Sequence, residues 1–176
     1  GLAEIGAFGP YIPIEYGGAG LDNISYGLIM QDLERCDSGI RSTASVQSSL
    51  VMYPIYKYGN ESQRKKYLPK LASGELIGCF GLTEPNHGSN PGGMTTNIKD
   101  KGDHYLLNGR KMWITNGNEA GIFIVFANLD PSKGYRGITA FVVERGYEGF
   151  TVGRKEDKLG IRASSTCELL FDNCVV

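Results

Sequence analysis

The chain has 176 residues, of which 41% are apolar and 21% are charged, so it can build a core and is not disordered in composition. Its length suits one domain of ordinary size or parts of two. The formal net charge of −1 argues against a broad nucleic-acid or anionic-membrane footprint. No apolar run approaches the roughly 20 residues that a membrane span needs.

The start of the chain and its cysteines give two further expectations. The first nine residues contain no initiator Met and no charged leader, so we expect no signal peptide and a start inside an existing fold. The cysteines form no C-x-x-C pair, and neither His87 nor His104 stands at metal-ligand spacing from them, which predicts no metal site. We expect reduced, mostly buried thiols in a reducing compartment, the bacterial cytoplasm or the mitochondrial matrix. The four thiols are Cys36, Cys79, Cys167 and Cys174.

Helical periodicity marks the N-terminal part of the chain. Asp22 or Asn23 is placed to cap a first helix that ends near residues 36–39. A second helix is predicted from about Arg41 towards Tyr58, with a kink or interruption at Pro54. The expected apolar faces are Ile24, Leu28, Ile29 and Leu33 in the first helix, and Val46, Leu50, Val51 and Ile55 in the second.

A third helix is predicted to begin at Asn60, because Gln63 follows three residues later, as in a capping box. Gly74 lies where a C-cap glycine belongs. The expected buried side of this helix is Tyr67, Leu68 and Leu71. The glycine-rich residues 17–20 lack the preceding strand that a dinucleotide-binding fingerprint requires, so we predict a loop there.

After Gly74 the pattern changes to short β-rich runs separated by turns such as residues 100–102 and 108–109. No helical run of useful length intervenes, which favours a mostly antiparallel sheet. The predicted fold class is α+β, with an N-terminal helical segment (residues 1–75) followed by an antiparallel β-barrel or sandwich domain (residues 76–176). The expected strands are residues 77–82, 95–98, 105–107, 112–115, 122–128, 138–143, 150–152 and 169–171.

Two short motifs carry the functional information. The first, GLTEPNHGSN at residues 81–90, is a polar loop that leaves an apolar run. The second, KMWITN at residues 111–116, places an indole beside a threonine hydroxyl in a strand-like segment. A flavin needs a flat apolar face, which Trp113 can supply, and polar contacts at its ring edge, which Thr83, Thr115 and backbone amides can supply. The alternative for Trp113 is a buried core aromatic.

With the helix-then-sheet order and KLGIRASS at residues 158–165, these motifs resemble the acyl-CoA dehydrogenase family over nearly the whole chain. The resemblance implies the later helices of that family's N-terminal domain and its central β-domain. The family's four-helix C-terminal domain is expected beyond Val176. It also implies non-covalently bound FAD, an electron-transfer flavoprotein or similar acceptor, and a homotetramer.

Carried over by position, the resemblance implies roles for particular residues. Thr83 would bond the ring edge with Leu82 packed under the ring, Thr115 would lie near flavin N5, and Ser89 would reach the CoA part of the substrate. The expected cofactor-binding residues are Phe80, Gly81, Leu82, Thr83, Glu84, Pro85, Asn86, His87, Gly88, Ser89, Trp113, Ile114 and Thr115. The family usually has Asp at the position of Asn90, which can still accept a loop hydrogen bond but carries no charge.

No residue of this chain is assigned as the catalytic base. The resemblance implies a Glu beyond Val176 that abstracts the α-proton of the thioester while the β-hydrogen leaves as hydride to flavin N5. Glu84 lies next to the flavin loop, but a carboxylate in a Thr-x-Pro turn more often braces the loop.

The segment around Arg41 and Ser42 resembles the glutaryl-CoA dehydrogenase branch, in which an Arg-Ser pair binds the distal carboxylate of the acyl chain. A guanidinium can hold a carboxylate bidentately. The alternative is a surface ion pair of Arg41 with Asp37. The expected reaction is FAD-dependent α,β-dehydrogenation of glutaryl-CoA or a related dicarboxylic acyl-CoA, to glutaconyl-CoA, or to crotonyl-CoA and carbon dioxide.

Two other functions stay open. Residues 160–167 resemble short- and branched-chain acyl-CoA dehydrogenases as much as the glutaryl branch. A non-catalytic module that holds CoA or a protein partner without oxidising it is the third interpretation.

Overall fold

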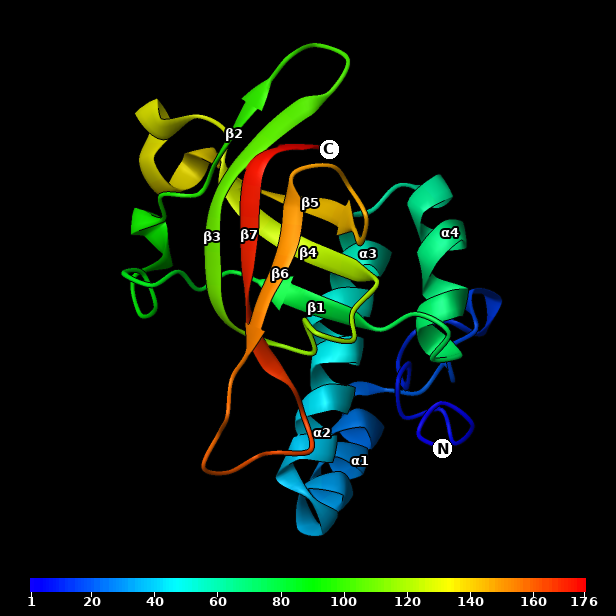
Figure 1. Ribbon diagram of the computed structural model, residues 1–176. Coiled ribbons are helices and arrows are strands. Elements are labelled where there is room, and N and C mark those ends of the chain that lie inside the picture. Colours follow the sequence, from blue (N-terminus) through cyan, green and yellow to red (C-terminus); the bar gives the residue numbers. More distant parts are fainter. The chain divides into compact units, whose positions relative to one another are not determined.

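The computed structural model describes residues 1–176. The chain divides into two compact units, one made of residues 1–79 and 157–164 and the other of residues 80–156 and 165–176. The first unit holds all the α-helices and the second nearly all of the sheet, so the predicted α+β class is confirmed (Figure 1).

Helix α1 (Asn23–Cys36) begins as predicted, because the Asp22 side chain accepts a hydrogen bond from the Ser25 N–H at 2.8 Å. Its expected apolar face is partly wrong, since Ile24 and Leu28 are exposed. The stripe that packs on the core is one position further round the helix. It consists of Tyr26, Ile29, Met30 and Leu33, which join Phe8 and Ala44 in the core.

The second predicted helix is continuous from α2 (Ser38–Ser45) through a π-helical segment η2 (Val46–Met52) into α3 (Tyr53–Tyr58). The predicted interruption therefore takes the form of wider turns directly before Pro54, whose missing N–H cannot continue the α-helical pattern. The wider π-helical turns of η2 also rotate the buried face of the helix away from the positions expected for a regular α-helix. Val51 and Ile55 are buried as expected, whereas Leu50 is exposed.

Helix α4 (Glu61–Ala72) has the predicted capping box between Asn60 and Gln63, and Gly74 adopts a left-handed φ of 75° just after its end. The three residues predicted for its inner side, Tyr67, Leu68 and Leu71, are buried. A loop with the 3-10 turn η1 (Ile14–Tyr16) precedes the helices and contains the glycine-rich residues 17–20, as predicted.

A buried glutamine holds the end of α4 to the π-helical segment. Gln47 is fully buried and donates to the backbone carbonyls of Leu71 (2.9 Å) and Leu76 (2.8 Å). Its side-chain oxygen accepts from the Gly78 N–H at 2.8 Å. One side chain therefore satisfies three backbone groups that would otherwise be buried without partners.

The sheet has seven strands in the order β1-β4-β2-β3-β7-β6, with β5 paired to β4. All pairings whose register is known are antiparallel except the short parallel contact between β2 and β4. Figure 1 shows β3, β7 and β6 side by side in this curled sheet. The strands are β1 (Gly78–Gly81), β2 (Asn97–Asp100), β3 (Tyr105–Thr115), β4 (Ile122–Asn128), β5 (Ile138–Glu144), β6 (Phe150–Lys155) and β7 (Thr166–Val175), with 3-10 turns η3 (Pro91–Gly93) and η4 (Pro131–Gly137) between them.

Strand β3 differs from the prediction, because one long strand replaces two short ones. The expected turn at residues 108–109 is instead a register shift within the β3–β7 pairing. Gly109 has φ 146°, and a Cβ there would lie 2.5 Å from the Thr96 hydroxyl oxygen. Glycine is needed at this position for close strand contact rather than for a turn.

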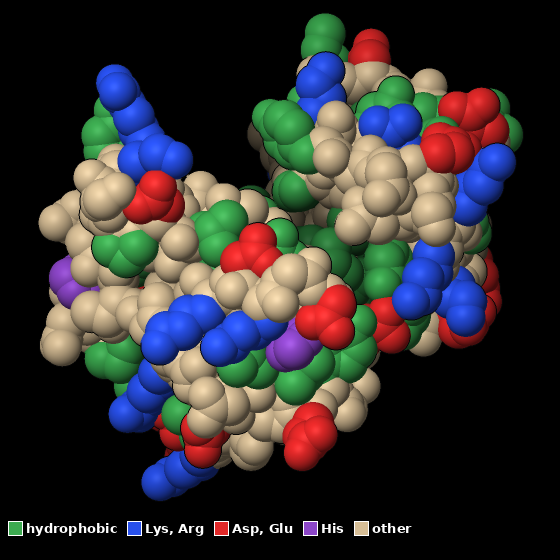
Figure 2. All heavy atoms as spheres, turned by 90° about the horizontal axis from the view of Figure 1, so that it is seen from above, with side chains coloured by type: hydrophobic (Ala, Val, Ile, Leu, Met, Phe, Trp, Pro, Cys, Tyr) green, Lys and Arg blue, Asp and Glu red, His purple; other side chains and the backbone are tan.

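On the face shown in Figure 2, basic and acidic side chains are interspersed. No helix is both long and apolar enough to cross a membrane. Three thiols are buried (Cys79, Cys167 and Cys174) and Cys36 is exposed.

Replacing Gln47 by Leu tests the polar link at the end of α4. The variant leaves two carbonyls and one N–H buried without partners, so we expect the free energy of unfolding to fall by about 3 kcal/mol. Chemical denaturation measures this loss. Ser49→Ala, which removes only the hydroxyl bond to the Ser45 carbonyl, serves as the control and should cost less than about 1 kcal/mol. Equal losses in both variants would contradict the role given to Gln47.

Candidate functional site

The loop that carries the first motif leaves β1 and folds into a tight turn over residues 84–87. Backbone hydrogen bonds close this turn from Glu84 N–H to His87 O (3.2 Å) and from His87 N–H to Glu84 O (3.1 Å). Pro85 and Asn86 lie exposed at its tip. The turn therefore fixes the backbone directly after Thr83 without using the Thr83 side chain.

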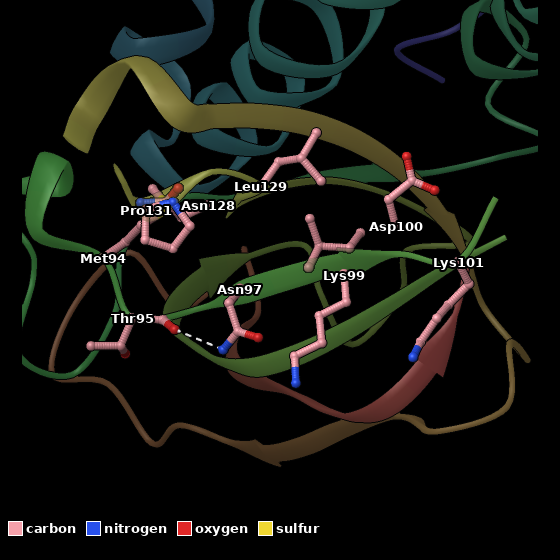
Figure 3. Close-up of a pocket in the computed structure, with 10 residues that line it drawn as sticks. Met94, Thr95, Asn97, Lys99, Asp100, Lys101, Asn128, Leu129 and Pro131 are labelled. Atoms are coloured by element: carbon pink, nitrogen blue, oxygen red, sulfur yellow. Dashed lines mark hydrogen bonds between the residues drawn. The ribbon is translucent and has the colours of Figure 1, made fainter. Parts of the chain in front are cut away.

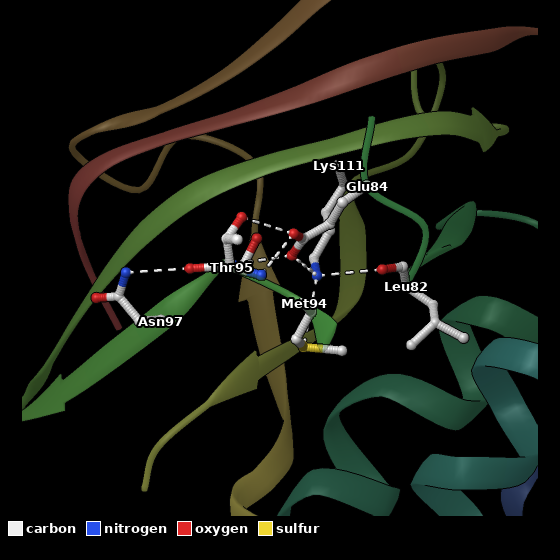
Figure 4. A network of polar contacts seen from close by, with 7 residues as sticks. Leu82, Glu84, Met94, Thr95, Asn97 and Lys111 are labelled. Carbon is white, nitrogen blue, oxygen red and sulfur yellow. Dashed lines mark hydrogen bonds and ion pairs between the residues drawn. The ribbon is translucent and has the colours of Figure 1, made fainter. Parts of the chain in front are cut away.

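The base of this loop is held by a buried ion pair. Lys111 is fully buried, and its ammonium donates to Glu84 Oε1 at 2.9 Å and to the Leu82 carbonyl at 3.2 Å (Figure 4). The other partners of the Glu84 carboxylate are the backbone N–H groups of Thr95 (2.7 Å) and Thr96 (2.9 Å) and the Thr95 hydroxyl (2.8 Å). Glu84 thus braces the loop, as expected for a carboxylate in such a turn.

Hydrogen bonds keep the Glu84 carboxylate of this pair ionised. Burial alone would raise the pKa of Glu84, but the donors from Thr96, Thr95 and Lys111 outweigh burial and lower it from 4.5 to about 2. Burial lowers the pKa of Lys111, an effect opposed by the Glu84 carboxylate. The change for Glu84 corresponds to roughly 3 kcal/mol in favour of the charged carboxylate. Glu84 is therefore unsuited to act as a proton-accepting base near neutral pH.

The second motif lies against this loop. The Met112 N–H donates to the Thr83 carbonyl at 2.8 Å, so β3 and the loop share a backbone bond next to the ion pair. The β3–β7 register shifts between Lys111 and Ile114, and within this bulge Trp113 adopts a left-handed φ of 60°. That conformation costs a non-glycine residue about 1–2 kcal/mol, and such strain concentrates at functional sites.

The bulge turns the indole outward. Trp113 is 58% exposed, whereas Ile114 beside it is buried. The interpretation of Trp113 as a buried core aromatic is therefore wrong. Asn116, also left-handed at φ 66°, ends the segment, and its backbone N–H donates to the Ser165 carbonyl at 3.1 Å.

The half-buried threonines of the two motifs keep their hydroxyls uncommitted. Neither the Thr83 nor the Thr115 hydroxyl has a hydrogen-bond partner in the chain. An exposed indole and two available hydroxyls thus belong to the segments that Lys111 and Met112 tie together. Ser89 is exposed further along the loop, and the Asn90 side chain makes no cap hydrogen bond to the turn that follows it.

Two hollows lie close to these segments. One, of about 520 Å³, is lined by the motif residues Leu82 and Asn90 together with Pro91, Gly92, Met94, Phe126, Tyr135 and Ile138. The other, of about 750 Å³, follows β2 from Met94 and Thr95 to Lys101. Figure 3 shows Lys101 at its far end from Thr95, with Lys99 between them. The first hollow adjoins the motif loop at Leu82 and Asn90, but Thr83, Trp113 and Thr115 do not line it.

The predicted substrate residues Arg41 and Ser42 belong to the helical unit, apart from the two motifs in the chain. The expected surface partner Asp37 is wrong, because its carboxylate caps α2 through the N–H groups of Gly39 and Ile40. Arg41 instead donates from Nε to Glu34 at 2.5 Å and from one Nη to the Ser45 hydroxyl at 3.2 Å. Its other N–H groups remain free for a further acceptor.

Comparison with known proteins agrees with both units. A family model described as "Acyl-CoA dehydrogenase, N-terminal domain" matches residues 1–75, and one described as "Acyl-CoA dehydrogenase, middle domain" matches residues 79–174. The chain belongs to the acyl-CoA dehydrogenase family. The family resemblance inferred from the motifs is thereby confirmed.

The names of relatives that are similar to this chain contain different substrates. The mitochondrial isovaleryl-CoA dehydrogenase of Pongo abelii is 44% identical over 177 residues, covering 99% of this chain and 42% of that protein. The butyryl-CoA dehydrogenase of Megasphaera elsdenii is 46% identical with a TM-score of 0.94, and the match covers 99% of this chain and 47% of that protein. A Mycobacterium smegmatis glutaryl-CoA dehydrogenase in complex with FADH2 is 47% identical with a TM-score of 0.93, and the match covers 99% of this chain and 44% of that protein. The chain therefore spans less than half the length of these relatives.

The sequence analysis assigned no role to the most constrained residue of this candidate site. Lys111 stood in the second motif without an assigned role, because a lysine in a strand is usually exposed and nothing in the local sequence marks this one as buried. Arg145 was also missed. It donates to the carbonyls of Ala120 (2.6 Å), Gly117 (2.8 Å) and Asn118 (3.0 Å), and so stabilises the turn after Thr115.

The lowered pKa of Glu84 predicts an acid-sensitive component of stability. Its folded pKa of about 2 lies below the unfolded value of about 4.3, so its contribution is complete above that value and is lost as the pH falls through about 2. Glu84→Gln should therefore cost roughly 3 kcal/mol near pH 7 and progressively less below pH 4. Denaturation curves across this pH range measure the difference.

The surface variant Glu75→Gln is the control, since that side chain is 64% exposed in a pair with Lys70 and should change stability by less than about 0.5 kcal/mol. A loss for Glu84→Gln that stays the same from pH 7 to pH 2 would contradict the ionised, hydrogen-bonded carboxylate.

Proposed function

We propose that this chain is part of an FAD-dependent acyl-CoA dehydrogenase that introduces an α,β double bond into an acyl-CoA. The observation that carries the proposal is the exposed indole of Trp113, held left-handed in β3 beside the loop of Thr83. The relative from Mycobacterium smegmatis, described in complex with FADH2, supports the same cofactor. Because the chain spans less than half of its relatives, the activity is proposed for the whole protein.

The residues present suit a flavin. The indole of Trp113 offers a broad apolar face, and the uncommitted hydroxyls of Thr83 and Thr115 offer polar contacts for a heterocyclic edge. Bound FAD would supply the acceptor for the hydride that leaves the β-carbon of the substrate. The chain's own contribution is to bind and orient the ring through residues 80–83, 85–89 and 113–115, with Ser89 placed for the CoA part of the substrate. Glu84, expected from the resemblance to touch the cofactor, is buried and braces the loop from within instead.

No carboxylate of the two motifs is suited to remove the α-proton. Both oxygens of Glu84 are taken by Lys111 and by the Thr95 and Thr96 donors, and its low pKa makes it a weak base. We therefore assign the base to a carboxylate outside these residues, as the family resemblance implies.

Glutaryl-CoA or a related dicarboxylic acyl-CoA is our proposed substrate class, and it rests on Arg41. Its Nε and one Nη are engaged, which leaves the terminal edge of the guanidinium for a distal carboxylate. Ser42 stands next to it with a hydroxyl that no residue of the chain engages. A short- or branched-chain substrate fits equally with the butyryl- and isovaleryl-CoA relatives, so the Arg41 test below decides between them.

The remaining proposals follow from family membership. The whole protein would be a homotetramer that passes electrons to an electron-transfer flavoprotein, in the bacterial cytoplasm or the mitochondrial matrix. We propose a boundary at about residue 75 between its helical and β-domains.

Trp113→Ala tests the cofactor proposal. In the whole protein we expect FAD to bind about ten- to a hundredfold more weakly, because a large apolar wall is lost, with Trp113→Phe intermediate. Fluorescence titration of the apoprotein with FAD gives the dissociation constants. Tyr58→Ala is the control, since Tyr58 is another exposed aromatic at 80%, and it should leave the affinity unchanged. Absence of flavin from the gently purified and reconstituted wild type would refute the proposal.

Arg41→Ala tests the substrate class. We expect the KM for glutaryl-CoA to rise about ten- to a hundredfold, because a charge-assisted contact worth roughly 1.5–3 kcal/mol is removed. Butyryl-CoA, which has no distal carboxylate, should be little affected, and Arg41→Lys should rescue only in part. Steady-state kinetics with both substrates give the ratio of kcat/KM.

The matched control for Arg41 is Arg35→Ala, which breaks the exposed pair with Asp32 in the same unit. If Arg41→Ala lowers kcat/KM by the same factor for both substrates, Arg41 is structural and the short- or branched-chain reaction is favoured.

A further inference from the structure

In the Glu84–Lys111 pair, the hydrogen-bonding capacity of both charged groups is fully used. The Lys111 ammonium has three acceptors, namely Glu84 Oε1, the Leu82 carbonyl and Met94 Sδ at 3.9 Å. Glu84 Oε1 also accepts from the Thr96 N–H, and Oε2 accepts from the Thr95 N–H and hydroxyl (Figure 4). Every donor of the ammonium is therefore used, and both carboxylate oxygens accept twice.

Along the chain, the residues held by this pair flank the residues proposed to touch the flavin. Leu82 and Glu84, on either side of Thr83, are both held by Lys111, while the Thr83 carbonyl is held by Met112. The Thr83 hydroxyl is left without a partner in the chain. On β3, the anchored Lys111 and Met112 directly precede Trp113 at its left-handed φ. The backbone on both sides of the proposed ring site is thus fixed by one network.

We propose that the buried Glu84–Lys111 pair is a positioning device that sets the Thr83 hydroxyl and the Trp113 indole in the arrangement that receives the flavin. The inference rests on the function proposed above and adds two residues that touch no ligand themselves. Lys111 and Glu84 are positioning residues that act through the backbone of Leu82, Thr83 and Met112.

Stability alone does not account for this pair. Two charges removed from water carry a desolvation cost that their attraction only offsets, and well-packed apolar side chains often stabilise such a site as well or better. What an apolar pair cannot supply is a directional link to the Leu82 carbonyl and to the Thr95 and Thr96 N–H groups. The expected consequence of losing the pair is a misplaced Trp113 in a protein that still folds.

The experiment uses the whole apoprotein labelled with fluorotryptophan, in which the Trp113 signal is assigned by its loss in Trp113→Phe. The variants are Lys111→Met and the double variant Lys111→Met with Glu84→Gln, which removes the unpaired charge that threatens folding of the single variant. The control is Arg110→Met, which breaks the half-exposed pair of the neighbouring β3 residue with Glu168. Fluorine NMR and FAD titration are recorded well below each thermal midpoint, with far-ultraviolet circular dichroism as the check of folding.

We expect the Trp113 fluorine signal to shift or split in the double variant and FAD affinity to fall at least about tenfold, while Arg110→Met matches the wild type in both. A folded double variant with an unchanged Trp113 signal and unchanged FAD affinity would overturn the inference and leave the pair purely structural. The two proposals fail differently. A wild type that binds no FAD contradicts the proposed function, whereas the fluorine signal tests the positioning of Trp113 without any flavin.

Discussion

A lysine and a glutamate withdrawn from water inside a curled sheet constrain the rest of this site. The ammonium of Lys111 and the carboxylate of Glu84 are both buried, so each must find its partners within the protein. The partners available are backbone groups of the loop at residues 82–84 and of the turn that leads into β2. The loop is therefore placed by hydrogen-bond directions rather than by the looser demands of apolar packing, and β3 bulges to bring Trp113 outward beside it.

The helical unit uses the same device on a smaller scale. Gln47 satisfies three backbone groups where α4 ends and β1 begins, within a segment widened into π-helical turns before Pro54. In both units a buried polar side chain, surrounded by apolar residues, fixes where a loop departs. Such sites are sensitive to substitution, because a missing partner leaves the remaining polar groups buried and unsatisfied.

Much of this fold follows from the sequence because local rules decide it. The caps at Asp22 and Asn60, the glycine after α4 and the strands β4 and β5 obey short-range chemistry. The errors arose where tertiary context decides. Leu50 is exposed because the π segment rotates the helix face, and Gly109 serves strand packing rather than a turn. The motifs located Thr83 and Trp113, but the partners of Lys111 lie 17 to 29 residues away in sequence, a separation that no local pattern encodes.

We propose that the Thr83 loop and the Trp113 bulge form one side of a flavin site. An experimental structure of the whole protein purified with FAD tests it most directly. We expect the isoalloxazine ring to pack against the Trp113 indole, with the hydroxyls of Thr83 and Thr115 within hydrogen-bond distance of its polar edge and the Glu84–Lys111 pair intact behind it. A flavin bound elsewhere, with these hydroxyls facing solvent, would contradict it.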